Sequence, residues 1–264
     1  MGKRSKQEEL IVEMLKSRRR IELSDICDGL GVSEATARRY LSSLEDNGTV
    51  IRTHGGAVLR DVARTYSYSN EASQMQEEKR RIVATAAALV QDGEHLFMDT
   101  GTTLNEFGNA LYLRLAEGTL KGVSIVTNSL TYNESLAEYC AVTLTGGRIR
   151  HNRRDLSGTI ALWTLANYRF DRAVLGVDSI DEDGTLYTTD DDTAAMARQA
   201  IANSTQVIIL ADSSKLRRTS YVAYAKLLPN KMELITDSRA PESFLRHIKG
   251  LGIQVITAEA INNH

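Results

Sequence analysis

Seven short apolar runs, separated by helical stretches, constrain the fold of this sequence more strongly than any other feature. The β-prone runs are His95–Met98, Val123–Thr127, Ala141–Thr145, Arg172–Gly176, Gln206–Ala211, Met232–Thr236 and Ile253–Ile256. The helical stretches between them are Asn105–Leu115, Leu130–Tyr139, Ile160–Asn167, Asp192–Ala202 and Pro241–Gly250. Several runs are apolar almost throughout, as expected for strands buried on both faces of a parallel sheet. The alternation therefore predicts an α/β domain with a mostly parallel, doubly wound sheet.

The first 60 residues follow a different pattern, in which helical stretches precede a short β-prone tail. Apolar residues recur at helical spacing in three groups, namely Leu10, Ile11, Met14 and Leu15; Leu23, Ile26, Cys27 and Leu30; and Ala37, Leu41 and Leu44. Gly31 suits a left-handed turn after the second group, and Ser33 is placed to cap the helix that carries the third. Two β-prone runs then flank Gly55-Gly56. This order predicts a helix-turn-helix followed by a β-wing.

The segment between the two patterns, residues 61–76, is polar and shows little apolar periodicity, so we interpret it as a linker. A helical pattern resumes from Glu77 to Val90. The predicted organisation is a winged helix-turn-helix domain over residues 1–60, the linker over 61–76, and an α/β effector-binding domain over 77–264.

Composition excludes some classes of protein. No apolar run approaches the roughly 18 residues of a membrane span, and the N-terminus lacks the apolar centre of a signal peptide. Cys27 and Cys140 lie far apart in unrelated contexts, so we expect no disulfide, no metal site and no cofactor. These features predict a cytoplasmic protein.

The helix that begins after Ser33 has the features of a recognition helix, whose N-terminal residues enter the major groove of DNA. Its apolar residues face inward, which leaves a pair of arginines directed outward. Arginine binds guanine or phosphate, whereas Ser and Thr mostly bind phosphate. The candidate DNA-binding residues, two of them in the predicted wing, are Ser33, Thr36, Arg38, Arg39, Tyr40, Arg52 and His54.

Charge supports this interpretation modestly. The first 60 residues hold 11 Lys and Arg against 9 Asp and Glu, while the rest of the chain holds 21 against 25. An arginine pair on an arbitrary helix is usually solvated, but here the turn, the cap and the Gly-Gly wing occur in the order that a DNA-binding domain requires. Lys3, Arg4 and Lys6 are placed to add non-specific phosphate contacts.

Polar residues gather where the predicted strands of the α/β domain end. The loop Asp99–Thr103 joins a strand to a helix, and it offers N–H groups, hydroxyls and a positive helix end to an anion. Ligands of open parallel sheets bind beyond the carboxyl ends of the strands. The candidate effector-binding residues are Asp99, Gly101, Thr102, Thr103, Asn128, Gly146, Gly147, Asp178 and Lys215. In this interpretation Lys215 neutralises a phosphate, and Asp99 or Asp178 accepts hydrogen bonds from sugar hydroxyls.

Taken singly, some of these residues have simpler interpretations. The loop at Gly101 is also a capped turn without a ligand, Gly146-Gly147 is also a tight turn, and Lys215 is also a solvated loop cation. Taken together, they predict a pocket for an anionic ligand.

Three further groups of residues have open or structural interpretations. The first is a basic loop that covers the ligand, joins a subunit interface, touches DNA or faces solvent, and it contains Arg148, Arg150, His151, Arg153 and Arg154. Asp190-Asp191-Asp192 is interpreted as a solvated helix N-terminus, with contacts to ligand hydroxyls or a cation as alternatives. The third group is interpreted as packing residues, and its members are Trp163, Tyr168 and Phe170.

The N-terminal pattern resembles the signature of the DeoR family of transcriptional regulators. The residues that carry the resemblance are Gly31-Val32-Ser33, Thr36, Arg38-Arg39, Leu41, Leu44-Glu45 and Gly48, followed by Arg52 and His54-Gly55-Gly56-Ala57. The family usually has Asp after the arginine pair, where this chain has Tyr40. The resemblance implies binding of a DNA operator, whose sequence the departure at Tyr40 leaves open.

The α/β domain resembles the C-terminal sensor domain of the same family. The matching residues are Asp99, Gly101-Thr102-Thr103, Thr127-Asn128, Gly146-Gly147, Gly158, Gly176, Asp178, Asp212-Ser213-Ser214-Lys215 and Thr236-Asp237. The resemblance implies a fold similar to ribose-5-phosphate isomerase and a phosphorylated sugar or polyol as effector. Ser179 departs from a common Gly, and Thr193 and Ala197 depart from Glu and Lys. Arg198 is interpreted as a replacement for the missing charge.

These features together predict a transcriptional regulator, in the first instance a repressor of a carbohydrate-utilisation operon. Its expected partners are a double-stranded DNA operator, a phosphorylated sugar or polyol, and further copies of the chain in a dimer or tetramer. One alternative is a sugar-phosphate isomerase with Asp178 or Asp99 as proton carrier. Another is a DNA-binding scaffold whose pocket no longer takes a ligand. We expect no enzyme, because no compelling acid–base set is evident and an isomerase does not need the first 60 residues.

Overall fold

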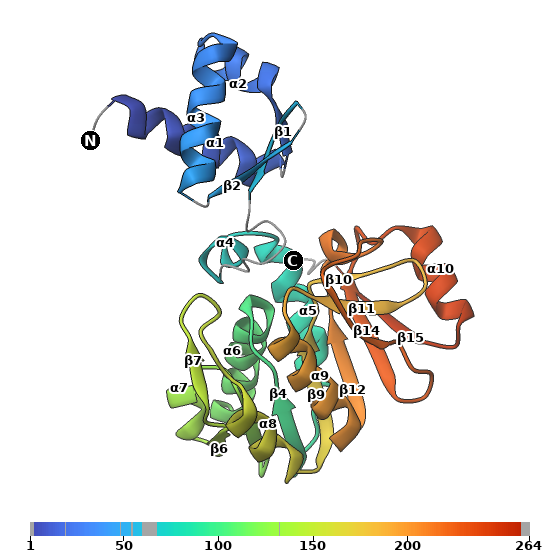
Figure 1. The fold of residues 1–264 in the computed structure, drawn as a ribbon. Coiled ribbons are helices and arrows are strands. Elements are labelled where there is room, and N and C mark those ends of the chain that lie inside the picture. The colour runs from blue at the N-terminus through green and yellow to red at the C-terminus, as the bar shows by residue number, and fades with distance from the viewer. Residues whose placement is uncertain are drawn as a thin grey trace. The chain divides into compact units, whose positions relative to one another are not determined.

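The computed structural model describes residues 3–18, 20–47, 49–53, 55–59, 68–131 and 133–259. The chain divides into two compact units, Met1–Thr65 and Tyr66–His264. The boundary falls within the segment predicted as a linker. Part of that segment forms helix α4 (Tyr68–Ala72), and helix α5 (Gln76–Ala88) follows it in the second unit (Figure 1).

The first unit is a winged helix-turn-helix. Its sheet is antiparallel with the strand order β1-β3-β2. Its described elements are α1 (Lys3–Arg18), β1 (Arg20–Glu22), α2 (Leu23–Leu30), α3 (Glu34–Asp46), β2 (Val50–Thr53) and β3 (Gly56–Leu59). Members of all three predicted apolar groups meet in one core, among them Ile11, Leu15, Ile26 and Leu41.

The turn between α2 and α3 forms as the sequence predicts. Gly31 adopts the left-handed conformation, with φ +62°, which a residue without Cβ enters at little cost. The Oγ of Ser33 accepts a hydrogen bond from the N–H of Thr36 at 3.4 Å and caps α3. In the wing, a Cβ on Gly56 would lie 1.9 Å from the carbonyl oxygen of Ile21, so glycine allows β1 and β3 to pair.

The second unit contains a seven-stranded, wholly parallel sheet with the order β15-β14-β12-β9-β4-β5-β6. Its strands are β4 (His95–Met98), β5 (Ser124–Thr127), β6 (Ala141–Leu144), β9 (Phe170–Gly176), β12 (Ser204–Leu210), β14 (Met232–Asp237) and β15 (Gln254–Ala258). Each lies within two residues of a predicted run at both ends. The predicted doubly wound α/β architecture is therefore confirmed.

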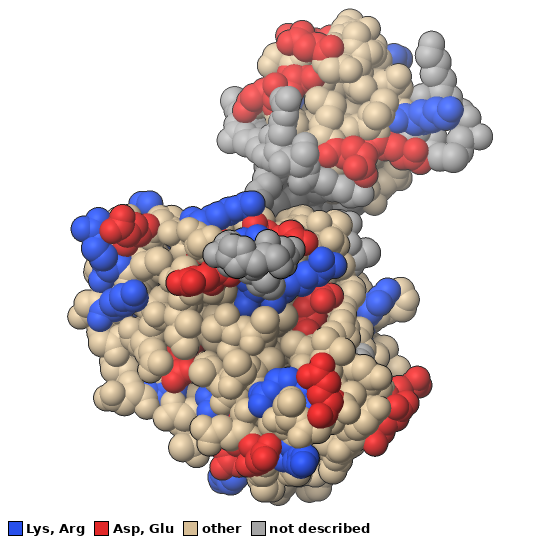
Figure 2. All heavy atoms as spheres, turned by 180° about the vertical axis from the view of Figure 1, so that it is seen from behind, with Lys and Arg blue, Asp and Glu red and all other residues tan. Residues whose placement is uncertain are grey.

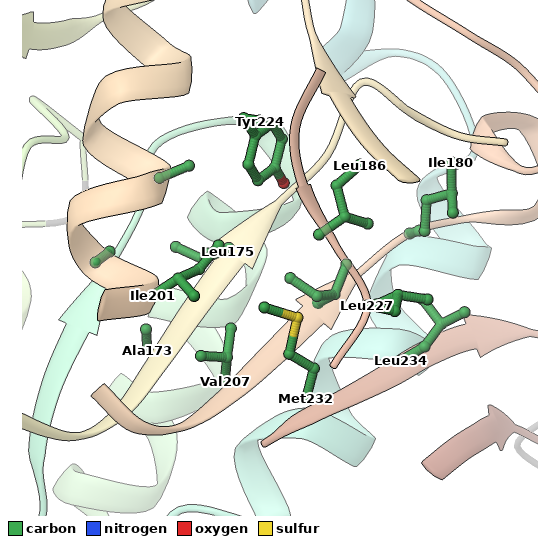
Figure 3. Packing of buried hydrophobic residues seen from close by; sticks show 14 of the residues in the cluster. Ala173, Leu175, Ile180, Leu186, Ile201, Val207, Tyr224, Leu227, Met232 and Leu234 are labelled. Atoms are coloured by element: carbon green, nitrogen blue, oxygen red, sulfur yellow. The ribbon is translucent and has the colours of Figure 1, made fainter. Parts of the chain in front are cut away.

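Helices cover both faces of this sheet (Figure 1). They are α5, α6 (Thr102–Ala116) and α7 (Asn133–Ala137) with one hydrophobic cluster, and α8 (Thr159–Ala166), α9 (Asp191–Asn203) and α10 (Glu242–Gly250) with the other. Successive residues of a strand point to opposite faces of the sheet and so pack in different clusters. In β4, Phe97 belongs to one cluster, and its neighbours Leu96 and Met98 belong to the other. Figure 3 shows the α9 side, where Leu175 and Val207 lie near Ile201.

Two smaller sheets were not predicted. One is antiparallel with the order β10-β11-β13, formed by β10 (Ser179–Ile180), β11 (Thr185–Thr188) and β13 (Val222–Lys226). The other is a hairpin of β7 (Arg148–Arg150) and β8 (Asp155–Ser157). A 3₁₀ turn, η1 (Ser213–Lys215), follows β12. The hairpin and η1 both carry charged side chains into the candidate ligand site.

Candidate functional sites

Helix α3, predicted to be the recognition helix, presents its two arginines outward. Ala37, Leu41 and Leu44 are buried in the core, whereas Arg38 and Arg39 are exposed. Arg38 makes an exposed ion pair with Glu34 at 3.4 Å, a kind of contact worth about 0–1 kcal/mol that a phosphate can replace.

The other candidate DNA-binding residues have more varied surroundings. Ser33 and Thr36 form the N-terminal cap of α3. Ser33 is exposed, and Thr36 is half-buried. Tyr40 is half-buried too and packs against the core. In the wing, the guanidinium of Arg52 lies 3.8 Å from Glu45, while His54 lies outside the described residues.

Charged side chains of both signs are interspersed on the face of the molecule that Figure 2 presents. Neither sign covers a broad area of that face.

A pocket lies at the carboxyl ends of β4, β9 and β12, where open parallel sheets bind ligands. It holds about 650 Å³ of space, including solvent at its mouth. Six of the nine predicted effector-binding residues line it, namely Asp99, Gly101, Thr102, Thr103, Asp178 and Lys215. Arg153 of the basic loop and Asp212 of the family pattern also line it, as do Glu71 and Lys79, which the sequence did not mark.

The N-terminus of α6 provides the part of the pocket suited to an anion. The helix begins at Thr102 rather than near Asn105 as predicted, and its N-cap is Gly101, with φ +123°. Gly101 has no side chain to cap the helix, so the first-turn N–H groups remain for water or a ligand. Beside them, Thr100 is 7% exposed, and its Oγ1 has no hydrogen-bond partner among the described residues.

Two lysines approach the same end of the pocket. Lys79 of α5 is 3% exposed, and its Nζ donates to the Oγ1 of Thr102 at 3.0 Å. Burial lowers the pKa of Lys79, against the opposing effect of the nearby Asp212 and Glu71 carboxylates. Lys215 comes from η1 and forms an ion pair with Glu71 of α4 at 2.7 Å. No local motif marks Lys79 or Glu71 as site residues.

The acidic side of the pocket contains Asp99 and Asp178. Burial raises the pKa of Asp99 to about 7, although a backbone hydrogen bond from Thr100 and the positive charges of Arg153 and Arg150 oppose the shift. The Oδ2 of Asp178 accepts hydrogen bonds from the Oγ1 of Thr188 at 2.9 Å and from the N–H of Thr189 at 3.0 Å.

The basic loop and the acidic run form one buried network of ion pairs. Arg150 binds Asp155 through two N–H groups and reaches Asp190 at 2.6 Å. Arg153 lies 3.2 Å from Asp190 and 4.0 Å from Asp178, which connects the network to the pocket. One interpretation of the sequence was that this loop faces solvent. That interpretation is wrong for Arg150 and Arg153, which are largely buried.

Asp190 is the N-cap of α9, as the predicted helix N-terminus requires, but the prediction that it is solvated is wrong. Burial raises the pKa of Asp190, yet Arg153, the N–H of Thr193 and Arg150 outweigh burial and hold it below the ordinary value. Asp192 is also paired, because it accepts a hydrogen bond from Arg148 at 2.8 Å.

Asn128, Gly146 and Gly147 do not line the pocket. The carbonyl oxygen of Asn128 accepts a hydrogen bond from the N–H of Leu156 in β8 at 2.8 Å. A Cβ on Gly147 would lie 2.5 Å from the carbonyl oxygen of Ser157. These residues therefore hold the β7–β8 hairpin in place, and the hairpin in turn positions Arg150 and Arg153.

Two further expectations are wrong. Arg198 does not replace the charge absent at Ala197, because its guanidinium donates to the carbonyl oxygens of Tyr224 and Ala223 in β13. Trp163 is not a packing residue, since 71% of it is exposed, whereas Phe170 is buried as expected.

Three structural features bear on the class of protein. None of the described helices has the length and apolar character needed to cross a membrane. Within the described ranges, no cluster of His, Cys, Asp or Glu is arranged to hold a metal ion. A winged helix-turn-helix joined to an α/β unit with a charged pocket at its strand ends defines a transcriptional regulator with a sensor domain.

Comparison with known proteins assigns the family. Residues 7–62 match the DeoR-like helix-turn-helix domain, and residues 74–238 match the DeoR C terminal sensor domain. The chain belongs to the DeoR family of transcriptional regulators, which confirms the resemblance found in the sequence.

Relatives match this chain over nearly its whole length. The HTH-type transcriptional repressor GlcR of Bacillus subtilis (strain 168) is 35% identical over 94% of this chain and 94% of its own. The HTH-type transcriptional regulator GlpR of Haloferax volcanii is 34% identical over 95% and 96%. The glycerol-3-phosphate regulon repressor of Escherichia coli (strain K12) is 29% identical over 93% and 95%.

Among solved structures, a ribose 5-phosphate isomerase A from Methanocaldococcus jannaschii aligns with a TM-score of 0.40 and 22% sequence identity. The alignment covers 52% of this chain and 53% of the isomerase. This partial likeness assigns no function.

Proposed function

We propose that the chain represses a carbohydrate-utilisation operon in the cytoplasm and releases or binds its operator in response to a phosphorylated sugar or polyol. The observation that carries this proposal is the convergence of Lys79, Lys215 and the uncapped N-terminus of α6 on one end of the pocket. The relative named as a glycerol-3-phosphate regulon repressor supports an effector of this chemical class.

The two ends of the pocket suit the two ends of such a ligand. The phosphoryl group would accept hydrogen bonds from the first-turn N–H groups of α6 and from the hydroxyl of Thr100, beside Lys215. The hydroxyl groups would donate to Asp99 and Asp178 across the pocket. Thr193 and Ala197 of α9 also line the pocket and add no charge there.

In the same proposal, residues 1–60 bind the operator, residues 77–264 bind the effector, and residues 61–76 join them. Arg38 and Arg39 of α3 contact DNA, and a dimer or tetramer places paired recognition helices on operator half-sites. The effector controls DNA binding to the extent that it binds one conformation more tightly than the other.

A thermal-shift screen of pentose, hexose and triose phosphates tests the effector class. A ligand at 100 times its Kd adds about 2.7 kcal/mol to the free energy of unfolding, so a true effector raises the Tm measurably. The dephosphorylated sugars are the matched controls, and Lys215→Ala is expected to weaken binding of the hit in calorimetry. Equal shifts with and without the phosphoryl group would contradict the proposal.

One observation favours isomerase chemistry in the same pocket, namely the Asp99 carboxyl with its pKa of about 7, which suits a proton carrier at neutral pH. Against it, Asp178 is held by two hydrogen bonds from β11 and its following loop. We expect no turnover of aldose or ketose phosphates by the purified chain. Conversion of any of them that is lost in Asp99→Asn would establish the enzyme instead.

A further inference from the structure

Helix α4 is attached at both of its ends to segments that line the pocket. At its beginning, the N–H of Tyr68 donates to the carbonyl oxygen of Asn152 at 3.1 Å. The guanidinium of Arg154 lies 4.7 Å from the centre of the Tyr68 ring. Asn152 and Arg154 flank Arg153, which lines the pocket.

At the other end of α4, Glu71 occupies the cationic part of the pocket. Its Oε2 accepts a hydrogen bond from the Nζ of Lys215 at 2.7 Å, and its carbonyl oxygen accepts one from the Nζ of Lys79 at 2.6 Å. The side chains of Lys215 and Glu71 are 19% and 26% exposed, so water screens this ion pair only in part. Glu71 thus presents a carboxylate to the lysine that a phosphoryl group would use.

We propose that Glu71 is an internal competitor of the effector phosphoryl group, and that effector binding detaches α4 from Lys215. The inference rests on the proposed function of the pocket. A phosphoryl group that binds Lys215 competes with the Glu71 carboxylate for the donors of one ammonium group and repels that carboxylate at close range, which favours its displacement.

The position of α4 in the chain gives this displacement a consequence. The last strand of the DNA-binding unit ends at Leu59, and α4 begins at Tyr68. Among the described residues, helix α4 is therefore the first element of the sensor unit after the winged helix. Lys215 holds one end of α4, and the two neighbours of the pocket residue Arg153 hold the other. The state of the pocket therefore determines how firmly this connection is anchored.

The test compares Glu71→Gln with the wild-type full-length chain, using inorganic phosphate at constant ionic strength as the probe. Glu77→Gln is the matched control, because it removes the same charge from an exposed ion pair with Arg80. We expect Glu71→Gln to bind phosphate about tenfold more tightly. In this variant, phosphate no longer has to break the charge-assisted hydrogen bond between Glu71 and Lys215. Glu77→Gln should bind phosphate as the wild type does.

Hydrogen exchange measured on the same proteins reports the detachment directly. Saturating phosphate should speed amide exchange in the peptide that covers α4 of the wild type, and Glu71→Gln should show faster exchange there without phosphate. The inference would be overturned if Glu71→Gln bound phosphate with unchanged affinity, or if phosphate did not alter the protection of α4. Neither result would contradict the proposed anion pocket. Failure of both wild type and Glu71→Gln to bind phosphate would overturn the anion pocket itself.

Discussion

Arg150 and Asp155 are cross-strand partners that flank the turn of the β7–β8 hairpin, and two parallel hydrogen bonds join them. The Nε of Arg150 lies 2.8 Å from Oδ1 of Asp155, and its Nη2 lies 2.6 Å from Oδ2. Asp155 is 0% exposed. Burial raises the pKa of Asp155, while the hydrogen bonds and charge of Arg150 oppose that shift. A carboxylate in this position depends on its arginine to remain ionised.

Arg150→Met should therefore destabilise the α/β unit by about 3–5 kcal/mol, because it leaves a buried carboxylate without its main partner. Chemical denaturation followed by circular dichroism measures the change. Arg148→Met is the control, since Arg148 is an exposed partner of Asp192 and its loss should cost less than about 1 kcal/mol. Equal effects of the two substitutions would show that the buried network does not support the hairpin.

Stability should depend on pH through Asp99. Its pKa is about 7 in the folded protein against an ordinary 3.8, so between these values the folded state holds a proton that the unfolded state has released. Stability is therefore lost as pH rises from about 4 to 7, by up to roughly 4 kcal/mol, and is constant above that range. Asp99→Asn removes this loss, so its advantage over wild type should grow between about pH 4 and 7 and then level off. A variant whose advantage does not change with pH would contradict the assignment to Asp99.

Thr100→Val should separate ligand binding from stability. The buried hydroxyl has no hydrogen-bond partner among the described residues, so replacing it with a methyl group should raise the free energy of unfolding by about 1 kcal/mol. The same change removes a donor to the ligand, so the variant should bind phosphate several-fold more weakly. Calorimetry and thermal denaturation of one preparation give both quantities. A loss of stability together with unchanged phosphate affinity would place the hydroxyl outside the site.

Arg38→Ala and Arg39→Ala should each weaken operator binding by about 1–3 kcal/mol if the arginine reads a base, and should reduce the salt dependence if it binds phosphate. Fluorescence anisotropy at several salt concentrations distinguishes the two cases. Arg246→Ala on α10 removes an exposed cation from the other unit and should leave operator binding intact. Unchanged affinity in both α3 variants would mean that α3 is not the recognition helix.

Gly147→Ala should destabilise the protein more than Gly93→Ala. Both glycines have positive φ, +109° and +77°, so alanine is strained at either position. At Gly147 the added Cβ would also lie 2.5 Å from the carbonyl oxygen of Ser157, whereas at Gly93 it meets nothing within 4 Å. We expect a difference in unfolding free energy of about 1–3 kcal/mol, which combines this steric contact with the less favourable φ at Gly147.

The seven strands of the parallel sheet were predictable because several are nearly continuous apolar runs, as strands buried on both faces require, while the edge strands β6 and β15 are only partly buried. Strands β7 and β11 were not, since their short, mixed sequences acquire a place only by pairing with β8, β10 and β13. The polar strand ends likewise predicted most of the pocket, because parallel topology brings the carboxyl ends of strands together.

The rest of the site depends on pairs distant in sequence. Lys215 and Glu71 are 144 positions apart, and Lys79 and Thr102 are 23 apart. From the sequence, exposure to solvent remained one interpretation of the basic loop. Local spacing cannot identify the partners of Arg150 and Arg153 at the start of α9. Arg198 lies next to the expected charged position, but the turn of α9 directs it to β13.

Because Trp163 is exposed, its fluorescence reports on the surroundings of α8 without any added label. The chain has one tryptophan, so all indole emission comes from this one site on the surface of α8. An indole in water emits at longer wavelength than one in an apolar contact. The emission maximum of the unlabelled protein, followed over a dilution series, will therefore reveal whether anything covers α8 at a given concentration.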